Sequence, residues 1–269
     1  MTDLKIISYF VLGSVFLVFL AALSPVTEAG AAEEPGGNRA MVGSVEVSLI
    51  GPEGLIKVDG QCPEADQFIE LIKERFKLRV LAMYADPEQW QYFVDGLAVK
   101  EPRSIPPLAA IGVTTRMDGK SYDDKRAAKE RRKLNNLVSL AINTRPLVSI
   151  FGNRANAKLR EKLGLDLGFR YQGLGEFVGK FDENDRSVSY SVLASSNLYG
   201  QKNENFVTLT ALRVSDKFIY LAWIDPDRTS EGISQTKTRT LNWVRQMNQE
   251  NFSEGESYQD SDQEVGRDS

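Results

Sequence analysis

The sequence predicts an α+β domain in which an antiparallel β-sheet is flanked by helices on both faces, an α/β/α sandwich. The stretch from Phe206 to Ile224 consists of two apolar runs joined at residues 215–217. Alternating β-branched and aromatic residues around a short polar turn are typical of an antiparallel hairpin. Because the second run is apolar on both faces, we expect it at the centre of a sheet that is covered on both sides.

The first elements of the domain follow from turn and cap residues. The sequence Gly-Pro-Glu-Gly at 51–54 predicts a hairpin between strands 44–50 and 55–58. A proline at the first helical position is favourable, because its missing N–H has no partner within the helix there. Pro63 and Pro87 therefore predict helices that run to about residues 76 and 94.

The middle of the domain continues with two strands and the longest helix. Apolar runs predict strands over 78–84 and 108–115. Ser121, followed by Asp123 and Asp124, is a suitable N-cap with acidic residues in the first turn. We expect this helix to continue to about residue 143.

The last third of the domain is mostly strand. Runs at 173–181 and 188–193 flank the polar turn 182–186, and an amphipathic helix over 233–247 closes the domain. The order of elements resembles that of the Mog1/PsbP-like α/β/α sandwich, and this resemblance implies a fold and no function. The predicted organisation is therefore a signal peptide or membrane anchor (1–31), a flexible linker (32–42), a single α+β domain (43–249) and a disordered acidic tail (250–269).

The chain begins with a segment that predicts export. Residues 6–23 are apolar without interruption and follow Lys5. As a signal peptide, the segment would be cleaved after Ala29 or Ala31, where small residues stand at the required positions. As a retained helix, it would just span a hydrocarbon core of about 30 Å. In either alternative the rest of the chain is exported across the cytoplasmic membrane. The domain is then periplasmic, or it is anchored in the membrane and faces outward.

Composition excludes several chemistries. The chain has no histidine, and Cys62 is its only cysteine. An intramolecular disulfide, a Ser-His-Asp triad and a Cys-His pair are therefore impossible, and the usual ligands of zinc, haem and iron–sulfur clusters are missing. We expect no cofactor and no metal.

Charge is unevenly distributed along the chain. The net charge of −4 includes an acidic tail, residues 250–269, with seven acidic residues and one basic residue. The body between the leader and the tail is consequently mildly basic. This excess falls well short of a nucleic-acid-binding composition, but it is compatible with an anionic neighbour, either a membrane surface or an envelope protein.

The predicted helix from Ser121 carries the clearest candidate binding site. Helical spacing places Lys125, Lys129, Arg132 and Lys133 on a common face. Such a cluster is suited to an anionic headgroup, a polyanionic glycan or an acidic partner. The alternative is an ordinary solvated face, with neighbouring acids forming local pairs.

The candidate catalytic pair is Ser234 and Lys237, which have the S-x-x-K spacing. On a helix these positions share a face, and a desolvated lysine there could accept the serine proton. The S-x-N and K-T-G elements that accompany this pair in penicillin-binding enzymes are absent in the required order. A solvated helix end explains the spacing equally well.

These observations predict an exported domain with a non-catalytic binding or envelope-accessory role. One alternative is a hydrolase-type enzyme that uses Ser234 and Lys237 or carboxylates near Asp225. The other is binding of an anionic surface through the basic helix at 125–133.

Overall fold

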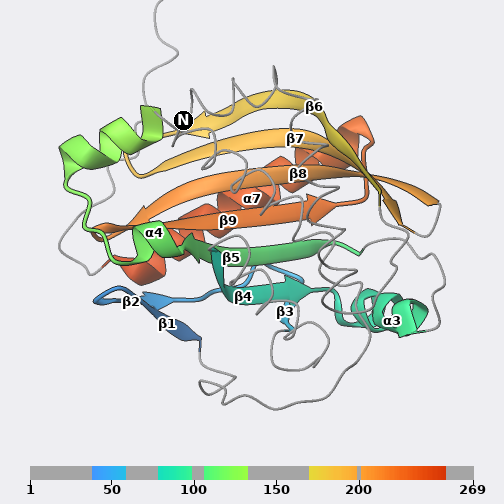
Figure 1. Cartoon of the computed structure of the whole chain (residues 1–269), viewed down its shortest axis with the longest axis horizontal. Helices are drawn as coiled ribbons and strands as arrows, with labels where there is room; N and C mark the ends of the chain where they lie inside the picture. The colour runs from blue at the N-terminus through green and yellow to red at the C-terminus, as the bar shows by residue number, and fades with distance from the viewer. Residues whose placement is uncertain (1–37, 59–77, 99–105, 133–169, 199–200, 253–269) are drawn as a thin grey trace, which may run out of the picture.

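The computed structural model describes residues 38–58, 78–98, 106–132, 170–198 and 201–252 (Figure 1). The architecture is mixed α+β, with a large antiparallel sheet and helices packed around it. The predicted apolar run 6–23, helix 63–76, Cys62, Lys133 and most of the acidic tail lie outside the described residues. Among the described helices, none has both the length and the apolar character needed to cross a membrane.

A seven-stranded sheet organises the fold. Every pair of neighbouring strands in it is antiparallel. In spatial order the strands are β3 (Ile56–Lys57), β4 (Leu78–Ala85), β5 (Leu108–Thr114), β9 (Lys217–Asp225), β8 (Gln201–Val214), β7 (Ser187–Leu198) and β6 (Arg170–Glu183).

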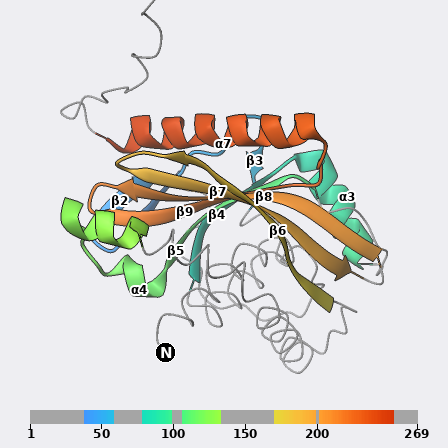
Figure 2. The same cartoon turned by 90° about the horizontal axis from the view of Figure 1, so that it is seen from above.

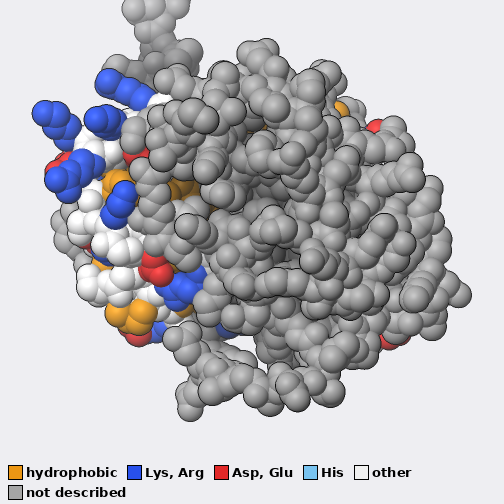
Figure 3. Space-filling view, viewed as in Figure 1, with side chains coloured by type: hydrophobic (Ala, Val, Ile, Leu, Met, Phe, Trp, Pro, Cys, Tyr) orange, Lys and Arg blue, Asp and Glu red, His pale blue; other side chains and the backbone are white. Residues whose placement is uncertain are grey.

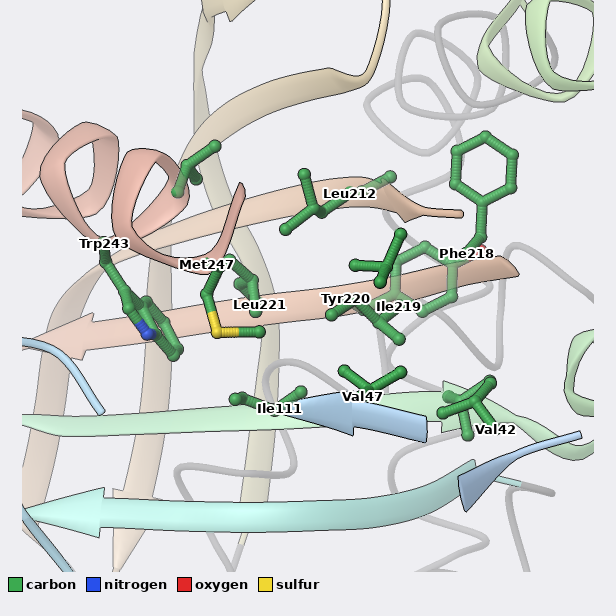
Figure 4. Packing of buried hydrophobic residues seen from close by; sticks show 14 of the residues in the cluster. Val42, Val47, Ile111, Leu212, Phe218, Ile219, Tyr220, Leu221, Trp243 and Met247 are labelled. Carbon is green, nitrogen blue, oxygen red and sulfur yellow. The ribbon is translucent and has the colours of Figure 1, made fainter. Parts of the chain in front are cut away.

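The strand β9 is the middle strand of this sheet, and all its residues are buried. It pairs with β8 through the turn at Ser215, so the predicted hairpin and its central position are confirmed. Alternation sends Ile219, Leu221 and Trp223 to one face of the sheet, while Phe218 and Tyr220 point to the other. Figure 4 shows this packing around β9.

The helix α7 (Ser230–Asn251) covers the face that carries Trp223. Figure 2 shows it lying along the sheet. Trp243 is buried against Trp223 and Tyr84 in edge-on ring contacts, and its indole N–H donates to the carbonyl of Ile50 at 2.6 Å. Val244 and Met247, two members of the apolar stripe predicted for the closing helix, are buried beside it. The other two members, Ile233 and Leu241, are only half-buried.

The start of α7 is held by a side-chain cap. The hydroxyl of Thr229 accepts the N–H of Gly232 at 3.0 Å and donates to Asp227 at 2.8 Å. The backbone N–H and hydroxyl of Thr229 together hold the pKa of the Asp227 carboxyl below its ordinary value. This cap explains why the helix begins a few residues before the predicted start at 233.

Replacing Thr229 by alanine tests this cap. We expect the free energy of unfolding to fall by about 0.5–2 kcal/mol, because the N–H of Gly232 loses its partner. Chemical unfolding monitored by circular dichroism measures the change. Thr238→Ala is the control, since that hydroxyl only donates to the carbonyl of Ser234 within the exposed part of the helix. Equal effects of the two substitutions would contradict the cap.

A separate hairpin of β1 (Arg39–Val42) and β2 (Val45–Ser48) packs beside the sheet. Its turn contains Gly43, whose φ of +59° favours glycine. The predicted pairing of 44–50 with 55–58 is not the pairing observed, because β2 pairs with β1 and β3 pairs with β4. The strand β1 therefore occupies part of the range 32–42 that was expected to be a linker.

The remaining helices follow strands β4 and β5. The helix α3 (Pro87–Ala98) begins at the predicted proline, with Asp86 capping the N–H of Gln89 at 2.9 Å. The short helix α4 (Thr115–Asp118) follows β5, and a second helix runs over 124–132. Met117 of α4 contacts Tyr220, on the side of β9 opposite α7.

Candidate functional site

The predicted basic helix exists over residues 124–132 and lies at one end of the sheet, near the turn between β8 and β9 (Figure 2). It begins three residues later than Ser121, since the cap is Asp123, whose carboxylate accepts the N–H of Arg126 at 2.7 Å. The predicted continuation to about residue 143 lies outside the described residues.

One side of helix 124–132 is attached to the sheet. Ala127 is buried, and Asp124 forms an ion pair with Arg213 of β8 at 2.6 Å. Arg131, two turns from Asp124, donates to the backbone carbonyl of Asn184 in the turn between β6 and β7. The helix is therefore tied at both ends of its inner side.

Three arginine side chains act electrostatically on Asp124, the first residue of this helix. The Arg213 guanidinium, bonded to Asp124, holds the pKa of that carboxyl below its ordinary value. The charges of Arg131 and Arg186 act in the same direction. Asp124 thus remains a carboxylate, and it neutralises only part of the positive charge around it.

The opposite side of the helix carries the candidate site. With about 100° between successive residues, Lys125, Lys129 and Arg132 point away from Ala127, and Arg126 projects to the side beside them. All four are exposed, and we call them the cationic face. Figure 3 shows Lys and Arg side chains gathered at this end of the molecule. Of the predicted set, three members thus share one exposed side, and Lys133 is outside the described residues.

The cations of this face are poorly neutralised by their surroundings. Arg126 approaches Asp123 at 3.7 Å, and both side chains are largely exposed, so the pair is weak. Lys125, Lys129 and Arg132 form no ion pair with another described residue. Of the interleaved acids, Asp124 is engaged by Arg213 on the inner side, Asp123 also caps the helix, and Glu130 is half-buried.

The segment before the helix, residues 120–122, attaches the helix to the sheet, and we call this segment the buried mount. The ring of Tyr122 contacts the ring of Phe218 edge-on, with centroids 5.1 Å apart. The backbone N–H of Tyr122 donates to the carbonyl of Asp216 at 2.8 Å. The Ser121 hydroxyl donates to the carboxylate of Asp216. The ammonium of the buried Lys217 donates to the carbonyl of Lys120 at 3.0 Å. These bonds attach the loop to the start of the central strand.

Sequence reasoning missed two cations beside the helix, Arg213 and Arg186. The side chain of Arg186 lies 3.7 Å above the ring of Phe252, the residue that caps the end of α7. Its backbone carbonyl accepts the N–H of Arg213 at 2.8 Å. Arg213 had a sequence signal, as it is the one charged residue in the run 206–214.

The structure places Ser234 and Lys237 in the first turns of α7. Ser234 is exposed, and the ammonium of Lys237 lies 5.6 Å from the ring centroid of Phe181. A proton relay needs a direct hydrogen bond between the serine hydroxyl and the lysine amine. Within the described part of the chain, the hydrogen bonds of α7 do not include one between these two side chains. The catalytic hypothesis stays a prediction.

Asp225, the other catalytic alternative, is bonded into the junction of β9 and α7. Its carboxylate accepts the hydroxyl of Thr236 at 2.8 Å and the N–H of Asp227 at 2.9 Å. A further buried bond joins Thr208 of β8 to Thr240 of α7 at 2.8 Å. These polar groups satisfy one another where helix and sheet meet, so they dock α7.

The cationic face is therefore the arrangement that is best suited to an external ligand. No cluster of three or more acidic or cysteine side chains within the described ranges is arranged to hold a metal ion. No protein-family model, curated protein or solved structure matches the chain.

Proposed function

We propose that the protein is an exported, non-catalytic domain that binds the anionic surface of a membrane through the cationic face. The observation that carries the proposal is the outward projection of Lys125, Lys129 and Arg132 from a helix whose inner side is fixed to the sheet. A fixed mount matters because it presents the charges together, without the loss of entropy that ordering a flexible segment would require.

The strength of this contact follows from the number of cations. Each cation near an anionic bilayer contributes about 1 kcal/mol, so the four residues of the cationic face supply about 4 kcal/mol. That energy alone corresponds to a dissociation constant of about 1 mM. The contact is therefore an auxiliary one, effective when the domain is already near a membrane.

The leader of the chain supplies that proximity in this proposal. The apolar run 6–23 is suited to deliver the domain as a signal peptide or to tether it as a retained helix. As a tether it would hold the domain beside a membrane, where the weak contact of the cationic face can act. We further propose that the complete fold is the α/β/α sandwich expected from the sequence. Coverage of one face by α7 and the contact of α4 on the other side of β9 support this arrangement.

Charge reversal tests the function. In Lys125→Glu/Lys129→Glu, two attractive contributions become repulsive, and we expect the affinity for phosphatidylglycerol-containing vesicles to fall about thirtyfold or more. The full chain is first held in phosphatidylcholine nanodiscs, so that the run 6–23 has its own lipid. Binding is then measured by co-sedimentation with the heavier vesicles.

Arg239→Glu/Arg245→Glu is the matched control for this experiment. It changes the net charge equally, and both residues are exposed on α7. We expect it to alter the affinity by less than about threefold, because only general screened repulsion is added. Equal losses for both pairs, or no loss for the Lys125/Lys129 pair, would rule out the cationic face as the binding site.

A further inference from the structure

We infer that the part of the acidic tail beyond α7 (residues 253–269) docks on the cationic face and competes there with external anions. This inference deepens the proposed function and rests on it for the identity of the competitor. It makes the tail an internal regulator, which an anionic surface must displace before the cationic face can bind.

The first support is the fixed position from which the tail departs. The side chain of Asn251 accepts the N–H of Ser48 at 2.7 Å and donates to its carbonyl at 3.0 Å. The next residue, Phe252, keeps its N–H on the carbonyl of Asn248 at 3.1 Å, and its backbone is extended. The tail therefore leaves the end of α7 at a defined point.

That point lies close to helix 124–132. The ring of Phe252 contacts the guanidinium of Arg186, whose carbonyl is bonded to the backbone of Arg213. The side chain of Arg213 in turn pairs with Asp124, the first residue of the helix. Direct contacts from Phe252 through Arg186 and Arg213 to Asp124 thus connect the start of the tail with the start of helix 124–132. Figure 2 shows helix 124–132 and one end of α7 at the same end of the sheet.

The second support is complementary charge. Beyond Phe252 the tail contains six acidic residues and one basic residue. The cationic face contains four basic residues, three of which lack an ion pair with any described residue. A single exposed pair contributes only about 0.2–1 kcal/mol. Several pairs formed together by a tethered segment benefit from an effective concentration in the millimolar range.

The third support is reach. Residues 253–269 span at most about 55–60 Å when extended, at 3.3–3.6 Å per residue. Residues 124–132 occupy about 13 Å of helix axis, at 1.5 Å per residue. The tail is consequently long enough to place its carboxylates along the whole cationic face from its attachment at Phe252.

Zero-length crosslinking tests docking directly, without lipid. The full chain is kept in a neutral detergent and treated with a carbodiimide, which couples carboxylates to lysine amines that are in contact. We expect tail carboxylates to couple to Lys125 and Lys129 at least about fivefold more than to Lys237, the reference lysine on α7. About 1 M salt, which reduces the Debye length to about 3 Å, should abolish this preference. Coupling without preference for Lys125 and Lys129 would overturn the inference.

Vesicle binding tests the competition. The six acids beyond Phe252 are replaced by their amides, E254Q, E256Q, D260N, D262N, E264Q and D268N. If the tail covers the cationic face about nine-tenths of the time, this variant should bind phosphatidylglycerol-containing vesicles about tenfold more tightly than the unaltered chain. A tail of the same composition in scrambled order should remain inhibitory. Unchanged affinity of the neutral-tail variant would overturn the competition.

The two arms separate this inference from the proposed function. Preferential coupling to Lys125 and Lys129, together with no vesicle binding by the neutral-tail variant, would support docking and contradict the anionic-surface function. The opposite result is salt-sensitive vesicle binding that is lost when the charges of Lys125 and Lys129 are reversed, while crosslinking shows no preference for these lysines. That result would support the proposed function and overturn the docking of the tail.

Discussion

Replacing Trp243 by alanine is expected to lower the free energy of unfolding by about 3–5 kcal/mol. The side chain is only 1% exposed and fills the space between α7 and the sheet. It contacts Trp223 with ring centroids 6.2 Å apart and Tyr84 at 6.4 Å. The substitution also removes the donor to the carbonyl of Ile50, in the chain that follows β2. The change therefore weakens the attachment of α7 and of the β1–β2 hairpin together.

Denaturant unfolding measures this loss, with Asn242→Ala as the control. Asn242 is the preceding residue on α7 but is exposed, so we expect its replacement to cost less than about 0.5 kcal/mol. A loss below about 1 kcal/mol for Trp243→Ala would show that α7 does not depend on this contact.

Tyr122→Ala is expected to have a comparably large effect on stability and an additional effect on binding. Tyr122 is 6% exposed and packs edge-on against Phe218, so the cavity left behind should cost about 3–5 kcal/mol. Because this ring lies directly before helix 124–132, its loss also loosens the cationic face. We therefore expect weaker binding to anionic vesicles even under conditions where the variant remains folded.

Tyr92→Ala is the control for this substitution, since Tyr92 is 61% exposed. It should change the free energy of unfolding and vesicle binding little. Thermal unfolding measures the change in stability, and co-sedimentation measures vesicle binding. Both use the same protein concentration for the two variants. If folded Tyr122→Ala binds vesicles as tightly as the unaltered chain, the buried mount is not needed for function.

The centre of the fold could be predicted from the sequence because its signals are local. The alternation in 206–224 specifies both the hairpin β8–β9 and the burial of β9 on two sides. The apolar stripe of α7 is likewise visible in the sequence. Both ends of α7 lie beyond the predicted range 233–247, because the cap at Thr229 precedes the first apolar residue of the stripe and the helix continues past Met247 to Asn251.

The N-terminal pairing could not be predicted in this way. The turn at 51–54 is a strong local signal, and the carbonyl of Pro52 does accept the N–H of Leu55 at 3.2 Å. The strands beside it nevertheless pair elsewhere, β2 with β1 and β3 with β4. Their choice depends on partners that are distant in sequence, such as Asn251, which bonds to Ser48.

The candidate site likewise has one part that the sequence predicts and another part that it does not. Helical spacing correctly placed Lys125, Lys129 and Arg132 on one side of a helix. The sequence did not indicate that Asp124 would pair with Arg213, or that Arg186 would meet Phe252. These contacts join segments that are far apart in the chain, and they determine which charges remain free for a ligand.

The central claim is that the cationic face binds an anionic membrane, and the salt dependence of vesicle binding tests it most directly. The unaltered full chain, held in phosphatidylcholine nanodiscs, is mixed with phosphatidylglycerol-containing vesicles between about 0.01 and 1 M salt. The Debye length then falls from about 30 Å to about 3 Å. We predict that binding decreases steadily across this range and is absent for phosphatidylcholine vesicles. Binding that is insensitive to salt, or equal for the two lipids, would contradict the account.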